Sequence, residues 1–339
     1  MSDLKTWGET LFYPDYIKKG KKGKEPKRVR AFSSKAHEKD ISFFKARLKG
    51  VVEKHPQVMV KITGGNHSFK EMAAHMDYIG RNGKVELETE QGEFIDYRLN
   101  AEQLSDMWHE TLMDDDGKTK WKQNYHVMFS MPEGTDRREF GIAARQAVYE
   151  LFGGNHQFIL AEHHDTPHPH IHVCVKAVGY DGTRLKTKKQ DLQRWREVFA
   201  ERLRERGIKA EATRRQVRGQ FKKAEPSALK QMKKNNPSAY RKYQKSDDLG
   251  LKQKEAARAG RPYKDTAAVA KARRTRKHVE AAYEKIIREL ENGDSSDKKL
   301  AKELQLFVNS MDGVKPKAEA VYRQEKARIE REQGRGLTR

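Results

Sequence analysis

The feature that most constrains this chain is a run of histidines between residues 163 and 172. Five of the 13 histidines of the chain lie in these ten residues. His170 and His172 alternate with Ile171 and Val173, which is the two-residue period of a β-strand with one apolar face. The chain is therefore expected to contain a sheet that buries one face and displays imidazoles on the other.

A second strand is predicted immediately before this one. Residues 157–163 favour a strand, and the six residues that follow it form a link short enough for the two strands to pair as neighbours. His163 closes the first strand, so its ring would lie close to those of His170 and His172. Three imidazoles would then converge on one ion and leave positions open for substrate or water.

The choice of the third ligand stays open at this point, because His164 is a rival to His163. Asp165 is placed to accept a hydrogen bond from a ligand histidine, which would orient that ring. On softness alone, three neutral imidazoles suit Mn²⁺, Zn²⁺, Co²⁺ or Ni²⁺ better than Mg²⁺.

The rest of this region alternates between strands and helices. Further strands are predicted at 58–62, 125–131 and, in a short form, 183–188, and helices at 68–79, 137–152 and 190–206. Strands that arrive as hairpins between helices favour an α+β fold, with a mostly antiparallel sheet and helices on one face. A basic α-helical extension follows this fold.

The helix predicted at 68–79 carries a candidate nucleophile. Ser68 and Glu71 form a capping-box pattern at its start, and its apolar stripe includes Met72 and Met76. Tyr78 lies about 140° from that stripe at 100° per residue, so it is not part of the buried face of its own helix. A tyrosine near a metal suggests transesterification, whereas a bound water would make a hydrolase.

Charge indicates a polyanionic partner, most often nucleic acid. The formal net charge is +22, and 34 of the 71 Lys and Arg residues lie in residues 211–339. Helices are predicted there at 265–291 and 297–311, and 318–339 is a charged helix or disorder. We expect a basic N-terminal arm at 1–54, an α+β domain at 55–219 and a basic helical extension at 220–339.

Cysteine content and hydropathy exclude several classes of protein. Cys174 is the single cysteine, so neither an internal disulfide nor a cysteine-rich zinc site can form. No run of about 18 apolar residues is present, so no membrane span is expected, and no signal peptide is visible. These features fit a cytoplasmic protein.

Three segments resemble, in order, the motifs of P-type conjugative relaxases. These enzymes belong to the HUH endonuclease superfamily and include the endonucleases that nick T-DNA borders. The segments are 76–84 around Tyr78, 126–136 around Ser130, and 163–172 with the pattern H-x-D-x-x-x-P-H-x-H. Residues 206–214 resemble the segment that closes the domain, so the likeness covers about 56–219.

The resemblance implies a mechanism and a role for each matching residue. His163, His170 and His172 would hold a divalent cation, for which we expect Mg²⁺ or Mn²⁺ with Zn²⁺, Co²⁺ and Ni²⁺ as alternatives. Tyr78 would attack the scissile phosphate and stay joined to the 5′ end of the nicked strand. Asp165 would assist, and Ser130 would help to hold DNA near that phosphate.

The predicted function is strand-specific nicking of DNA at an origin of transfer, for plasmid mobilisation or conjugation. The partners would be single-stranded or supercoiled DNA, an accessory DNA-binding protein and a type IV coupling protein. Predicted DNA contacts are basic and aromatic side chains of the domain and the extension, namely Arg81, Lys84, Lys176, Tyr240, Arg241, Lys242, Tyr243 and Lys245.

Three other functions are also compatible with the sequence. A rolling-circle replication initiator would use the same chemistry at another origin. A basic DNA-binding module with a structural metal would not cleave DNA. A metallohydrolase that uses water would turn over repeatedly and leave no covalent adduct. The sequence has no G-x-x-x-x-G-K-[ST] pattern, so a P-loop motor is not expected.

Overall fold

A computed structural model describes residues 2–12, 17–18, 27–28, 41–95, 108, 120–221, 227–245 and 248–336. Its contacts divide the chain into two compact units. The first comprises residues 1–14, 34–45 and 214–339, and the second comprises residues 15–33 and 46–213. The division on the C-terminal side falls after Thr213, a few residues before the position 219 expected from the sequence.

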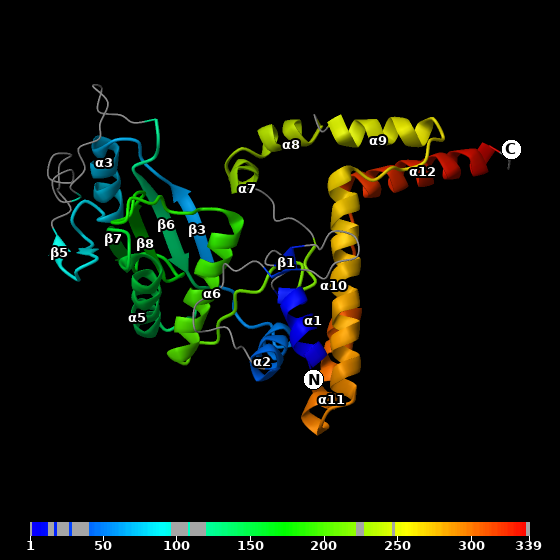
Figure 1. Ribbon diagram of the computed structural model, residues 1–339. Coiled ribbons are helices and arrows are strands. Elements are labelled where there is room, and N and C mark those ends of the chain that lie inside the picture. The colour runs from blue at the N-terminus through cyan, green and yellow to red at the C-terminus, as the bar shows by residue number, and fades with distance from the viewer. Residues whose placement is uncertain are drawn as a thin grey trace. The chain divides into compact units, whose positions relative to one another are not determined.

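The second unit is built on an antiparallel sheet of six strands in the order β3-β6-β8-β7-β4-β5 (Figure 1). The strands are β3 (Met59–Gly64), β4 (Leu87–Thr89), β5 (Phe94–Ile95), β6 (Asn124–Ser130), β7 (Phe158–His163) and β8 (His170–Lys176). A separate pair is formed by β1 (Ile17–Lys18) and β2 (Lys27–Arg28). The α+β class and the antiparallel sheet predicted from the sequence are confirmed.

One face of the six-stranded sheet is apolar and packs against two helices. These are α5 (Arg137–Val148), which continues into a π-helical turn, and α6 (Lys189–Glu205). Val127 and Phe129 of β6 and Val173 of β8 are buried in this core. The predicted two-residue period is therefore confirmed, because alternate residues of each strand reach the helices.

The opposite face of the sheet is partly covered by α3 (Phe69–Ile79), so helices lie on both faces. Ser68 caps this helix, since its hydroxyl accepts a hydrogen bond from the Glu71 N–H at 3.2 Å. Met72 and Met76 are fully buried against the sheet. The predicted stripe is thus the buried face, and α3 ends at Gly80, beside the ends of β7 and β8.

The short strand predicted at 183–188 is wrong. The chain after β8 turns at Asp181 and Gly182, and only an isolated bridge joins Val178 to Arg184. One edge of the sheet is formed instead by β5, which pairs antiparallel with β4. Neither strand is long enough to show a period in the sequence.

The first unit is helical in its described residues. Its helices are α1 (Ser2–Phe12), the start of α2 (Ile41–Val52), α7 (Ser227–Asn235), α8 (Pro237–Lys245), α9 (Asp248–Arg258), α10 (Ala267–Glu291), α11 (Ser295–Asn309) and α12 (Lys317–Gly336). The helices predicted at 265–291 and 297–311 are confirmed as α10 and α11. Among the described residues, no helix combines the length and the apolar character needed to cross a bilayer.

The N-terminal segment, expected as a basic arm, contains two helices. Leu11 and Phe12 of α1 and Phe44 of α2 are buried, so apolar side chains fix both segments. Most of the lysine-rich stretch at 18–28 lies outside the described residues. The high lysine content of this stretch led to the prediction of an arm for the whole segment, and the short amphipathic helices on either side of the stretch were not predicted.

Candidate active site

Three histidines converge at the adjacent ends of β7 and β8. His163 and His170 are paired across the two strands, and His172 lies two residues further along β8 on the same face. One ring nitrogen from each histidine lies within 4.8 Å of the others. The three ring centroids are 4.7 to 5.3 Å apart. The sheet therefore gathers the three imidazoles that the sequence singled out.

Hydrogen bonds fix which nitrogen of two rings carries the proton. His163 Nε2 donates to the Ile79 carbonyl at 2.6 Å, and His170 Nδ1 donates to the His168 carbonyl at 3.0 Å. A carbonyl oxygen can only accept, so the lone pairs lie on His163 Nδ1 and His170 Nε2. A ligand histidine that donates its second nitrogen to a backbone carbonyl is the usual arrangement at metal centres, and it fits a divalent cation here.

Burial favours the neutral form of two of the clustered histidines, His163 and His172. The pKa of His172 is lowered to about 3, first by burial and then by the neighbouring His163 and His170 rings. Burial likewise lowers the pKa of His163, against a smaller opposing effect of its hydrogen bond to Ile79. Neutral imidazoles are the form that binds metal.

The structure favours His163 over its rival. The His164 side chain is 62% exposed, and its nearest charged neighbour is Glu162 at 3.7 Å. Among the described residues, the group that could hold one ion comprises His163, His170 and His172 and does not include His164. His168 has a different role. Its Nδ1 accepts a hydrogen bond from the Glu133 N–H at 3.0 Å, which supports the turn that follows β6.

Tyr78 lies beside the three histidines. It is the penultimate residue of α3, its side chain is 58% exposed, and its ring faces the His172 ring edge-on with centroids 6.3 Å apart. The prediction that Tyr78 lies off the buried stripe is confirmed. The phenol is thus accessible from solvent next to a group of histidines that could hold a metal ion.

Asp165 was expected to accept a hydrogen bond from a ligand histidine, but its partner is Arg81. Its carboxylate accepts from Arg81 Nε at 3.0 Å and lies 2.8 Å from an Arg81 terminal nitrogen. The pKa of Asp165 is lowered, because the charge and hydrogen bond of Arg81 outweigh the desolvation that raises it. Arg81 Nη2 also lies 3.2 Å from His163 Nδ1, so Asp165 reaches the cluster through Arg81.

The remaining predicted residues of this unit occupy different places. Ser130 is buried and is paired directly with His170 across β6 and β8. Lys84 is exposed in the turn that follows α3. Lys176 is held within the domain, since its Nζ donates to Gln157 Oε1 at 3.0 Å and to the carbonyl of Trp108.

A second pair of histidines lies on the same face of the sheet. His75 of α3 and His126 of β6 are stacked, with ring centroids 3.4 Å apart and planes 5° apart. Burial lowers their pKa values to about 3 and about 4, respectively. The sequence analysis did not single out this pair, although His75 is one helical turn before Tyr78 and His126 lies on the same strand as Ser130.

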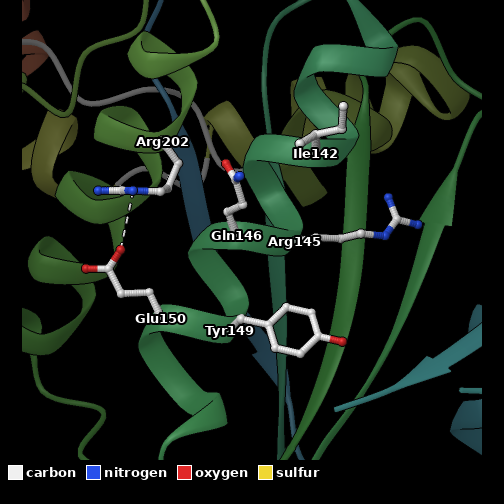
Figure 2. A pocket seen from close by; sticks show the side chains of 6 residues that line it. All are labelled: Ile142, Arg145, Gln146, Tyr149, Glu150 and Arg202. Atoms are coloured by element: carbon white, nitrogen blue, oxygen red, sulfur yellow. Dashed lines mark ion pairs between the residues drawn. The ribbon is translucent and has the colours of Figure 1, made fainter. Parts of the chain in front are cut away.

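A hollow along α5 is separate from the histidines. Its lining side chains are Ile142, Arg145, Gln146, Tyr149, Glu150 and Arg202 (Figure 2). Arg202 Nε lies 3.4 Å from a carboxylate oxygen of Glu150, and Arg145 is bonded to Glu88 and Glu162. These charges are already paired within the protein, so the hollow adds nothing to the candidate site.

The predicted DNA contacts of the extension all lie on α8, in the other unit. Arg241 and Lys242 are exposed, and the Tyr243 side chain is 52% exposed. The Tyr240 ring lies 5.9 Å from the ammonium of Lys233. The side chain of Lys245 lies outside the described residues.

The sheet places the histidine cluster and the adjacent tyrosine together in one candidate site. Residues 78–208 match the family described as "Relaxase: MobA/VirD2-like, nuclease domain". This region contains Tyr78, Ser130 and all three clustered histidines. This part of the chain, 131 of its 339 residues, is therefore similar to relaxase nuclease domains of the MobA/VirD2 type.

Similar proteins are T-DNA border endonucleases named VirD2. The chain is 27% identical to that of Rhizobium radiobacter over 185 residues, which cover 48% of this chain and 43% of the relative. It is 27% identical to that of Agrobacterium fabrum over 184 residues, covering 45% and 41%. With that of Rhizobium rhizogenes it shares 29% over 134 residues, covering 35% and 30%. The matched part is thus less than half the length of these relatives.

Proposed function

We propose that this protein is a relaxase that nicks one DNA strand at an origin of transfer and stays joined to the cut strand through Tyr78. The observation that carries the proposal is the position of the Tyr78 ring, exposed and 6.3 Å from His172 in a cluster of three histidines. A nucleophile, a cation site and an open approach for a phosphate are then combined within one short stretch of sheet and helix.

The proposed reaction is a transesterification. Tyr78 Oη attacks the scissile phosphorus, the new O–P bond forms, and the bond from phosphorus to the 3′ oxygen breaks. The phenol loses its proton and the departing 3′ oxygen gains one, so atoms and charge balance. The phosphotyrosine keeps the energy of the phosphodiester, and a later 3′ hydroxyl can reverse the transfer and rejoin the strand.

The histidines and their neighbours have distinct proposed roles. His163, His170 and His172 hold a divalent cation, with Mg²⁺ or Mn²⁺ as first candidates and Zn²⁺, Co²⁺ or Ni²⁺ as alternatives. A cation bound there would neutralise the charge that builds up on the phosphate. Asp165 fixes Arg81 beside His163, and Ser130 holds the DNA close to the reacting phosphate.

Further DNA contacts complete the proposal. Arg81 and Lys84 in the turn after α3 would meet phosphates near the nick, and α8 would grip the strand through Arg241 and Lys242. An accessory DNA-binding protein and a type IV coupling protein would act with the nicked strand. The substrate would be the DNA of the donor cell, so we place the reaction in the cytoplasm.

A denaturing gel tests this function directly. The full chain is incubated with labelled single-stranded oligonucleotides that tile candidate origins of its own genetic element, in Mg²⁺ or Mn²⁺. We expect a band of covalent adduct that EDTA abolishes. Tyr78→Phe should lower its yield by at least about a thousandfold, because phenylalanine lacks the phenol oxygen that is the proposed nucleophile.

Tyr180→Phe is the matched control, since Tyr180 is an exposed tyrosine of the same unit (65%) that bonds to Glu90. It should form the adduct as the parent does. Cleavage without adduct would indicate a hydrolase, and binding without cleavage would indicate a DNA-binding module. Adduct only at a replication origin would identify a rolling-circle initiator.

A further inference from the structure

The ligand nitrogen of His163 is already in contact with a side chain. His163 Nε2 donates to the Ile79 carbonyl, so Nδ1 carries the lone pair. Arg81 Nη2 lies 3.2 Å from this Nδ1 and donates to it, because a guanidinium has donors and no acceptor. A lone pair that accepts from Arg81 is not available to a cation.

Arg81 has two further contacts that hold it in this place. Its guanidinium bonds to the Asp165 carboxylate at 2.8 and 3.0 Å, and it lies 5.2 Å from the centre of the Tyr78 ring. The side chain thus contacts the proposed nucleophile, one proposed ligand and the acidic residue of the same motif.

The backbone at Arg81 adopts a strained conformation that places the side chain beside His163. Arg81 and Asn82 both have a φ of +52°, followed by Gly83 at +88°. Residues with side chains adopt the left-handed region rarely, and such strain persists where the surrounding structure requires it. The turn that ends α3 directs Arg81 back toward the histidines instead of into solvent.

We propose that Arg81 is a positioning residue that competes with the divalent cation for His163 Nδ1. Binding of the cation then displaces the guanidinium from His163, while Asp165 keeps it beside Tyr78. The state of the cation site and the surroundings of the nucleophile are thereby linked through one side chain. This inference rests on the proposed function, since it concerns the assembly of the same site.

Calorimetric titration of the full chain with Mn²⁺ tests the competition without any DNA. Arg81→Ala should bind Mn²⁺ about tenfold more tightly than the parent, because a hydrogen bond from a charged donor no longer has to be broken. A residue with a merely structural role would leave the affinity unchanged or reduce it. Tyr78-dependent adduct formation by the parent, measured separately, shows whether the proposed function itself holds.

Lys84→Ala is the matched control, because it removes one positive charge from the same turn, and Lys84 is exposed. Each titration is done in about 0.1 M and about 1 M NaCl, where the screening length falls from about 10 Å to about 3 Å. The gain for Arg81→Ala should persist in high salt, whereas any gain for Lys84→Ala should disappear. An affinity for Arg81→Ala that is unchanged, weaker or equal to that of Lys84→Ala would overturn the inference.

A second measurement covers the case in which Arg81→Ala is poorly folded. In the parent chain with ¹⁵N-labelled histidine and arginine, the His163 Nδ1 resonance reports whether its lone pair is engaged. Addition of Zn²⁺ should shift this resonance and also the Arg81 Nη2–H signal, because the contact of that nitrogen with His163 is lost while its contact with Asp165 stays. Arg81 signals that stay unchanged while His163 Nδ1 shifts would contradict the competition.

Discussion

At the residue scale, the neighbours of each imidazole determine what it can do. The stacked rings of His75 and His126 are neutral because burial lowers their pKa values to about 3 and about 4. His126 Nε2 lies 2.5 Å from Asn66 Oδ1, which can only accept, so this nitrogen carries the proton. In the unfolded chain both rings regain an ordinary pKa of about 6.5.

This difference predicts how stability depends on pH. Between pH 6.5 and the folded pKa values, the unfolded chain binds protons that the folded chain does not, so the free energy of unfolding falls as the pH falls. Each such histidine contributes about 1.4 kcal/mol per pH unit at most. The contribution is fully present above the unfolded pKa. We expect urea unfolding of the metal-free protein to show a marked loss of stability between pH 7 and pH 5.

His75→Phe isolates one part of that loss. It keeps an aromatic ring against His126 but removes a titratable group, so the loss between pH 7 and pH 5 should shrink by up to about 2 kcal/mol. His164→Gln is the control, because His164 is exposed and is not part of the cluster. Equal pH slopes for His75→Phe and the parent would show that His75 titrates normally in the folded state.

The relative positions of side chains could be predicted from the sequence where they depend on the two-residue period of a strand or on a short connection. His170 and His172 share a face because they are two apart in a strand, and His163 follows from the short link between two strands. The partner of Asp165 was not predictable in this way. Arg81 reaches it from a distant turn, and that contact depends on three successive left-handed residues and on the packing of α3 against the sheet.

At the scale of elements, α3 positions the nucleophile, and its first turn is fixed by one side chain. Ser68 is buried and its hydroxyl accepts from the Glu71 N–H, while the Glu71 carboxylate accepts from the His67 N–H at 2.8 Å. Ser68→Ala should therefore lower the free energy of unfolding by about 1 kcal/mol, as loss of a helix cap does. Urea unfolding at neutral pH measures this change.

Lys70→Ala is the comparison for that experiment, since Lys70 is exposed in the same turn and its side chain caps nothing. It should change stability by less than about 0.5 kcal/mol. Similar losses for Ser68→Ala and Lys70→Ala would mean that the cap does not hold α3.

The contact between α5 and β7 depends on the absence of a side chain at Gly141. A Cβ at this position would lie 2.8 Å from both carboxylate oxygens of Glu162, which bonds to Arg145 at 2.6 Å. Gly141→Ala should therefore displace Glu162 and destabilise the domain by about 1–3 kcal/mol, despite the better helix propensity of alanine. Thermal unfolding followed by circular dichroism measures the effect.

Gly154→Ala provides the contrast, because a Cβ there would meet nothing within 4 Å and its φ is −76°. It should leave the unfolding temperature unchanged or raise it slightly. A Gly141→Ala variant as stable as Gly154→Ala would show that Glu162 moves aside freely.

Elements were predictable where they are long and periodic. The helices predicted at 137–152 and 190–206 correspond to α5, with the turn that continues it, and α6. The strands β4 and β5 have three and two residues, so they carry no period, and their place at one end of the sheet comes from long-range pairing. The segment at 183–188 has the composition of a strand, but it follows a tight turn and forms only one bridge.

At the scale of the whole molecule, the charge is unevenly distributed between the two units. The segment 211–339 holds 34 of the 71 basic residues, and exposed Arg241 and Lys242 lie together on α8. If α8 grips DNA, each of these side chains neutralises a phosphate and releases counterions. The affinity for DNA would then depend on salt in proportion to the number of such contacts.

The double variant Arg241→Gln/Lys242→Gln tests this assignment in the full chain. Binding of a fluorescent single-stranded oligonucleotide is measured by anisotropy at several salt concentrations. The slope of log K against log salt should become shallower by about 1.4, because each phosphate contact with a single strand contributes about 0.7. Affinity should fall most at low salt, where counterion release contributes most.

The control must carry the same loss of charge elsewhere in the same unit. Lys298→Gln/Lys299→Gln on α11 meets this condition, since both lysines are exposed and away from α8 in the sequence. It should leave the slope nearly unchanged. A similar decrease in slope for both double variants would mean that the general field of the extension, rather than α8, attracts DNA. With DNA in excess, both variants should still form the Tyr78 adduct, because neither changes the histidine cluster or the nucleophile.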